Sequence, residues 1–163
     1  MYLILSRTDE LLFMNPREGK YISCRYDPED IPEVTAITTT SDNNIYILTS
    51  NREDNNRFIM FQYNHAGNVW EHAHAGMSSV SGFKASEHSE DSVHRRDDYL
   101  VEVERILYYL VVEVRVNGAL VQMTKYNRHT DQWQECSQLQ IEAMPYIYYS
   151  AALSCGPNLY VLT

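Results

Sequence analysis

Six histidines, three cysteines and two tryptophans are the side chains of this 163-residue sequence best suited to chemistry. His72 and His74 are two residues apart, so on a strand both imidazoles would point to one face and could share a metal. The sequence shows no third ligand at a suitable spacing, which favours an exposed polar face instead. His88 and His94 fall in a charged stretch and are expected to be solvated. We therefore expect no metal and no cofactor.

The cysteines Cys24, Cys136 and Cys155 each lie in or beside an apolar stretch, which is typical of small buried hydrophobic side chains. A cysteine nucleophile would need a histidine partner that the sequence does not place. The sequence also contains no glycine-rich phosphate loop, no Gly-x-Ser-x-Gly and no His-Glu-x-x-His. These observations predict no catalytic residues and a protein that is not an enzyme.

The charge balance restricts the partners. With 22 acidic and 13 basic residues the formal net charge is −9, which argues against a nucleic-acid backbone or an anionic membrane as partner. No apolar run approaches the roughly 18 residues of a spanning helix, and the start of the chain lacks the features of a secretory signal. Three scattered cysteines do not make a disulfide framework. We expect an intracellular protein, cytoplasmic or also nuclear.

The elements that must position any site are predicted to be strands. Four short segments combine tyrosine with aliphatic residues between turn-forming residues, and their apolar residues continue on both side-chain parities, as in strands covered on both faces. These segments are 2–5, 45–48, 107–110 and 159–162. The stretch 98–114 has some helical periodicity, but its five valines make it a poor helix. The fold class is therefore all-β.

A second signature recurs three times. An asparagine precedes a large aromatic residue by six positions, with turn-forming residues between them: Asn15 and Tyr21, Asn64 and Trp70, Asn127 and Trp133. An apolar strand precedes each asparagine, so each copy is predicted to be a hairpin. The interval of 17 residues between Tyr46 and Tyr63 also recurs, to within one residue, between Tyr108 and Tyr126. The chain is therefore predicted to be a repeat protein with four antiparallel strands per repeat.

These hairpins resemble the kelch repeat over nearly the whole chain. Asn15 with Tyr21, Asn64 with Trp70 and Asn127 with Trp133 correspond to the turn and the tryptophan of a kelch blade, with tyrosine replacing tryptophan in the first copy. The diglycine of the family is absent. The blade markers implied by the resemblance are Tyr21, Trp70, Trp133, Tyr46, Tyr108 and Tyr160. The two tryptophans are expected to pack blade against blade rather than to stack on a ligand.

The resemblance implies a partial β-propeller of about three four-stranded kelch-type blades, with its ends staggered mid-blade. The kelch-repeat region covers 1–163, with blade portions 1–33, 34–80, 81–139 and 140–163 and a surface-loop insertion at about 76–98. An open stack would leave unpaired edges and apolar faces. We therefore expect either a portion of a longer propeller or two copies completing a ring, and closure favours the first.

Loops at one end of the blades are the expected place for function, because rigid scaffolds carry their binding residues on loops. Arginine, tyrosine and asparagine there are predicted to bind a partner. The predicted partner-binding residues are Arg7, Arg52, Asn55, Arg95, Arg96, Arg115 and Tyr146. The competing interpretation of each is an ordinary solvated loop residue.

Three functions remain open. Many intracellular kelch propellers are the substrate-binding half of BTB-kelch adaptors, so the resemblance implies a protein-recognition module that binds a degron peptide within a cullin-based ubiquitin ligase. The cullin would be engaged through a BTB domain that is not present in this chain. An actin-binding or scaffolding kelch protein is one alternative. A copper-dependent sugar oxidase, as in a few kelch-type propellers, is disfavoured because the histidines are concentrated in one hairpin and one loop.

Overall fold

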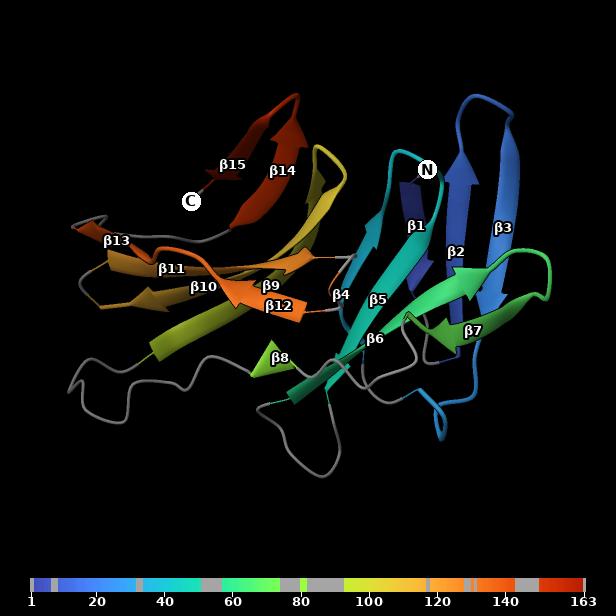
Figure 1. Cartoon of the computed structure of the whole chain (residues 1–163), viewed down its shortest axis with the longest axis horizontal. Helices are drawn as coiled ribbons and strands as arrows, with labels where there is room; N and C mark the ends of the chain where they lie inside the picture. Colours follow the sequence, from blue (N-terminus) through green and yellow to red (C-terminus); the bar gives the residue numbers. More distant parts are fainter. Residues whose placement is uncertain are drawn as a thin grey trace. The chain divides into compact units, whose positions relative to one another are not determined.

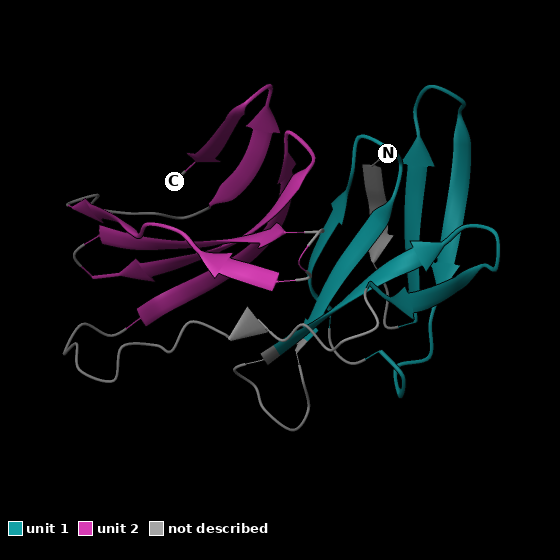
Figure 2. Ribbon diagram, viewed as in Figure 1, with its two compact units in different colours: residues 1–79 teal, residues 80–163 magenta. Residues whose placement is uncertain are grey.

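The computed structural model describes residues 2–6, 9–31, 34–50, 57–73, 80–81, 93–116, 118–127, 130, 132–142 and 150–162. Every regular element in these ranges is a β-strand (Figure 1). The pairs that build the four sheets below are antiparallel. The all-β prediction is therefore confirmed. The chain divides into two compact units, residues 1–79 and residues 80–163, coloured separately in Figure 2.

The first unit contains two sheets. The first sheet has the order β1-β2-β3. Its strands are β1 (Tyr2–Ser6), β2 (Glu10–Asn15) and β3 (Lys20–Arg25). The second sheet contains the path β4-β5-β6-β7. Its strands are β4 (Val34–Thr39), β5 (Ile45–Ser50), β6 (Arg57–Asn64) and β7 (Val69–His72). Both paths follow chain order, so each sheet is an up-and-down meander.

The second unit is built in the same way. After the two-residue β8 (Val80–Ser81), the third sheet has the order β12-β11-β10-β9, and β13 also pairs with β11. Its strands are β9 (Val93–Val103), β10 (Ile106–Arg115), β11 (Gly118–Asn127), β12 (Gln132–Glu135) and β13 (Leu139–Glu142). The fourth sheet is the hairpin of β14 (Ala151–Cys155) and β15 (Asn158–Leu162).

The three predicted hairpins are confirmed, and they share one register. In each, the residue before the asparagine lies opposite the aromatic residue six positions after the asparagine. The pairs are Met14 with Tyr21, Tyr63 with Trp70, and Tyr126 with Trp133. The asparagine Oδ1 accepts a backbone N–H inside its own turn in all three copies, from Arg17, from Ala66 and Gly67, and from Thr130. The recurring asparagine therefore closes the turn, which is the local reason for the repeat.

Each unit has its own apolar core. In the first unit, Leu11 and Phe13 of β2 pack with Ile45 and Ile47 of β5, and Trp70 packs against the edge of this cluster. In the second unit, the core uses one face of the third sheet, and the fourth sheet packs on it through Ala152, Leu159 and Val161. Full burial of one such aliphatic or aromatic side chain stabilises a fold by about 1.5–3 kcal/mol, so these paired sheets are held together mainly by their facing rows.

The strands predicted to be covered on both faces behave differently from one another. Every residue from Ile45 to Thr49 in β5 is buried, and so are those from Tyr109 to Val114 in β10. The prediction holds for these central strands. Of the tyrosine markers, Tyr46 is buried, but Tyr21 and Tyr160 are 63% and 45% exposed, because both lie on the outer faces of edge strands. Their recurrence therefore marks strands without marking the core.

Two sequence expectations are wrong. Residues 93–98 were expected in the surface-loop insertion, but they form the first half of β9. They are charged, yet they pair with β10 over their whole length. Cys155 was expected to be buried and is exposed, and Cys136 is only partly covered, whereas Cys24 is fully buried as expected. Only one face of the fourth sheet, the face that carries Leu159 and Val161, packs on the core. Cys155 lies on the other face.

The buried cysteine gives a pH-dependent expectation. Burial raises the pKa of the Cys24 thiol to about 12, against a smaller opposite effect of its hydrogen bond with Tyr63. The unfolded chain loses this proton first, from about pH 9, so the neutral thiol contributes stability below pH 9 that is lost as the pH rises toward 12. We expect the difference in unfolding free energy between the wild type and Cys24→Ala to shrink between pH 8 and 10, measured by urea denaturation at each pH.

Thiol labelling tests the burial of Cys24 in the folded protein. At pH 8 the exposed Cys155 should react with a small thiol reagent much faster than Cys24, because Cys24 is buried and its pKa is raised to about 12, which leaves very little reactive thiolate. Mass spectrometry of the labelled peptides measures both rates. Equal rates in the folded protein would contradict the burial of Cys24.

Candidate functional site at one end of the third sheet

The structure places three of the seven predicted partner-binding residues together. Arg95 and Arg96 lie in the first half of β9, and Arg115 is the last residue of β10. In the strand register Val114 lies opposite Arg95 and Glu113 lies opposite Arg96, so all three arginines are at the same end of the third sheet. Arg7, Arg52, Asn55 and Tyr146 lie outside the described residues. The expectation that Arg95, Arg96 and Arg115 are loop residues is wrong.

The alternation of a strand explains how the charges are arranged. The segment Arg-Arg-Asp-Asp at 95–98 places an arginine and an aspartate two residues apart on each face of β9. Arg95 bonds Asp97 on one face with an Nε–Oδ1 distance of 2.8 Å. Arg96 bonds Asp98 on the other with an Nη2–Oδ1 distance of 3.2 Å. Each arginine is thus oriented by a carboxylate on its own strand.

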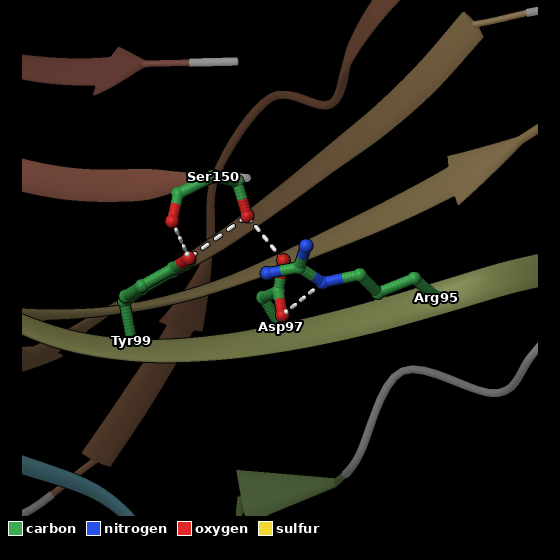
Figure 3. Close-up of polar contacts among 4 residues, drawn as sticks. All are labelled: Arg95, Asp97, Tyr99 and Ser150. Carbon is green, nitrogen blue, oxygen red and sulfur yellow. Dashed lines mark hydrogen bonds and ion pairs between the residues drawn. The ribbon is translucent and has the colours of Figure 1, made fainter. Parts of the chain in front are cut away.

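On the first face, Asp97 also reaches the fourth sheet (Figure 3). Ser150, the residue before β14, donates its hydroxyl proton to Oδ2 of Asp97. The Tyr99 hydroxyl is 2.6 Å from the Ser150 carbonyl oxygen and 2.8 Å from its Oγ. Tyr99 donates its one hydroxyl proton to the carbonyl oxygen, which can only accept. This network ties the start of β14 to β9.

The geometry of the Ser150–Asp97 contact indicates a structural role rather than a catalytic one. A serine nucleophile needs a base that can take its proton and hand it on, which in hydrolases is an imidazole between serine and carboxylate. Here the serine bonds the carboxylate directly, and that carboxylate is already held by Arg95. The arrangement favours a rigid strand junction over an activated nucleophile.

The second face holds a buried tyrosine. The Tyr109 hydroxyl donates to Oδ1 of Asp98 at 2.5 Å and accepts from Nη2 of Arg96 at 3.3 Å. Burial, and then the negative charge of Asp98, raises the pKa of Tyr109 far above its ordinary value, so its hydroxyl remains a donor. Burial lowers the pKa of Arg96, but the charge of Asp98 and its hydrogen bond outweigh that effect and the net direction is upward. Tyr109 therefore stays neutral and Arg96 stays charged in neutral solution.

A third ion pair lies at the same end of the sheet. Glu113, only 2% exposed, accepts a hydrogen bond from Nη2 of Arg115 at 2.8 Å. Within the described part of the chain, Nε of Arg115 and Oε1 of the buried Gln122 have no hydrogen-bond partner. A buried carboxylate is costly unless it is paired, so Arg115 is needed to keep Glu113 in the fold. Arg115 is therefore a structural residue at least as much as a binding one.

Within the described residues, the histidines do not come together in a candidate metal site. His72 packs against Phe61 with ring centroids 4.6 Å apart, and His94 lies exposed on β9. His74 and His88 lie outside the described residues. Among the residues that the structure describes, no three histidine, cysteine, aspartate or glutamate side chains lie close enough to hold a metal ion.

Sequence reasoning missed the partners that orient the arginines: Asp97, Asp98, Tyr99, Tyr109, Glu113 and Ser150. The signal available was the pattern of two arginines followed by two aspartates, which gives one ion pair to each face only if the segment is a strand. Ser150 could not be found in this way, since it is more than 50 residues from Tyr99.

Comparison with known proteins gives no assignment: the chain matches no protein-family model and no curated protein sequence. Among the described residues, none belongs to a helix long and apolar enough to cross a membrane.

Proposed function

We propose that the chain is part of a kelch-type β-propeller whose task is to recognise another protein. The observation that carries the proposal is the shared hairpin register, in which Met14–Tyr21, Tyr63–Trp70 and Tyr126–Trp133 occupy equivalent positions in three successive meander sheets. Successive four-stranded meanders with recurrent aromatic residues are typical of propeller blades. Propellers present their loops and strand ends as rigid recognition surfaces.

The proposed recognition surface is the edge of the third sheet along the first half of β9, where Arg95 lies on one face and Arg96 on the other. Their side chains are 37% and 33% exposed, so each retains contact area for a partner while an aspartate fixes its orientation. Arginine held in place loses little side-chain entropy on binding, which favours affinity. A peptide with acidic or aromatic side chains suits such a surface, because guanidinium groups bind carboxylates and stack on rings.

The finer proposal follows from the kelch resemblance. As the substrate-binding part of a ubiquitin-ligase adaptor, the surface would hold a degron peptide, and the cullin would bind through a BTB domain outside this chain. A scaffolding or actin-binding role uses the same surface with a different partner. The experiment below separates these roles.

The test is affinity purification of the tagged protein from cells that express it, comparing the wild type with Arg95→Ala/Arg96→Ala. We expect the wild type to recover a cullin together with a substrate whose half-life lengthens when the protein is depleted. The double variant should keep the cullin and lose the substrate. Arg17→Ala, an exposed turn residue of the first sheet, is the matched control and should behave as the wild type. Thermal unfolding of all variants controls for folding.

Other outcomes would decide against parts of the proposal. Recovery of actin without a cullin, with sedimentation on actin filaments, would replace the adaptor by the scaffolding role. Stoichiometric copper in the purified protein, with no protein partner, would overturn the recognition proposal itself. Substrate retention by the double variant would move the binding surface away from Arg95 and Arg96.

A further inference from the structure

The third sheet carries a pocket of about 540 Å³ at the end opposite the arginines described above. The turn between β9 and β10 forms one side through Glu104 and Arg105, and the end of β11 contributes Lys125, Tyr126 and Asn127. Ile106, 38% exposed, supplies apolar surface. A volume of this size is in the range of small-molecule sites, roughly 300–1000 Å³.

The strand register explains why these side chains gather. Lys125 lies directly opposite Tyr108, and Ile106 is two residues before Tyr108 on the same strand, so Lys125 and Ile106 share one face of the sheet. Arg105 precedes Ile106 in the turn. A cation from the turn and a cation from β11 therefore flank one apolar side chain.

The two cations differ from the arginines at the other end. Arg95, Arg96 and Arg115 each have an ion pair with an acid two residues away on their own strand. Within the described part of the chain, Arg105 and Lys125 have no ion pair. Glu104 is the one acid that lines the pocket there. In a protein of net charge −9, two cations without ion pairs beside one acid are a local excess of positive charge.

The turn that positions Arg105 is strained. Glu104 and Arg105 have φ values of 50° and 67°, and two successive positive φ angles mark a type I′ hairpin turn. That turn strongly prefers Asn-Gly, because residues with a bulky Cβ are disfavoured at positive φ. Neither Glu104 nor Arg105 is a glycine or an asparagine, the residues that would relieve the strain. Retained backbone strain is concentrated at ligand sites, where it holds side chains in place.

We propose that this pocket binds a small organic anion, with its anionic group between Arg105 and Lys125 and its apolar part on Ile106. The chemistry common to the possible ligands is a carboxylate or a phosphate monoester joined to an apolar group. Arginine binds either group in a bidentate manner and lysine adds a point charge. The site is distinct from the proposed protein-recognition surface, which lies at the other end of the sheet.

The test uses phenyl phosphate and phenylacetate as probes, with the neutral 2-phenylethanol as control, followed by isothermal titration and by amide chemical shifts. We expect saturable binding of at least one anion with a Kd of about 1 mM or tighter, and shifts confined to residues around the turn. The neutral compound should bind at least about tenfold more weakly. Which anion binds more tightly identifies the ligand as a carboxylate or a phosphate monoester.

Variants separate the pocket from general charge effects. Arg105→Gln and Lys125→Gln should each weaken binding at least about tenfold, while Lys20→Gln, which removes the same charge from a 75% exposed side chain of the first sheet, should not. Arg105→Gly should relieve the turn strain, so it should raise the unfolding midpoint and still weaken binding. This variant excludes misfolding as the cause of lost affinity.

Four results would overturn the proposal. They are the absence of saturable anion binding below about 10 mM, equal affinity for the neutral compound, unchanged affinity in both pocket variants, and equal weakening by Lys20→Gln. Each can occur with the recognition surface of Arg95 and Arg96 intact, so failure here is distinguishable from failure of the proposed function.

Discussion

Replacing Gly118 by alanine is expected to destabilise the protein by about 3 kcal/mol or more, the largest effect of any substitution of a glycine in the described chain. Gly118 begins β11 and lies opposite Glu142 of β13. A Cβ placed on it would lie 2.0 Å from the carbonyl oxygen of Ile141, inside the van der Waals limit. Its φ of 141° is a further obstacle, because L side chains rarely adopt it. The obstacle is backbone, so no side-chain rearrangement can remove it.

Gly19→Ala is the matched control for backbone conformation alone. Gly19 has a φ of 62°, but a Cβ there would have no atom within 4 Å. We expect it to cost about 1 kcal/mol, the typical penalty of the left-handed conformation. Urea denaturation of both variants measures the difference. Equal losses would show that β13 does not approach β11 as described.

Trp133→Ala is expected to cost about 3 kcal/mol. The Trp133 ring packs on Tyr126 with centroids 5.0 Å apart and meets Tyr109 edge-on at 6.5 Å. Tyr126 and Tyr109 are 1% and 0% exposed, so removing the indole would uncover two buried rings. Trp70→Ala should have a similar effect, because Trp70 stands in the same relation to Tyr63, with centroids 5.1 Å apart.

Two further substitutions show that packing is the cause. Trp133→Phe should cost less than about 1.5 kcal/mol, since the indole Nε1 has no hydrogen-bond partner among the described residues and most of the ring contact remains. Tyr21→Ala, at the equivalent position of the first hairpin, should cost less than about 1 kcal/mol because that side chain is 63% exposed. Denaturation midpoints compare all four variants. A Tyr21→Ala loss as large as that of Trp133→Ala would contradict this account of the core.

The hairpins could be predicted from the sequence because their signals are local. Asn15, Asn64 and Asn127 close their turns with their own side chains, and the aromatic residue follows at a fixed distance along the chain. A local hydrogen bond repeated at one spacing is visible in a single sequence. The strands next to these turns were therefore also correctly placed.

The first half of β9 could not be recognised in the same way. A segment with two arginines and two aspartates looks like a solvated loop when only polarity is considered. In the fold its charges are neutralised in pairs on each face. Tyr109 of β10 and Ser150, the residue before β14, add hydrogen bonds. Those partners are distant in the chain, so the stabilisation that makes this segment a strand appears only with tertiary structure.

The backbone strain at Glu104 and Arg105 and the close backbone approach at Gly118 also could not be predicted from the sequence. Glu104 and Arg105 contradict the residue preference of their own turn, and Gly118 is required by the approach of β13 rather than by its neighbours in the chain. Both features depend on how strands are brought together. They are the positions where local preference and the global fold disagree.

The central claim is that the three asparagine hairpins are equivalent parts of one repeat, since the proposed recognition function rests on it. Cross-strand nuclear Overhauser effects in the folded protein test it directly. We expect backbone contacts between Met14 and Tyr21, between Tyr63 and Trp70, and between Tyr126 and Trp133. A register shifted by one residue in any of the three hairpins would turn its aromatic side chain to the other face, and it would contradict the repeat.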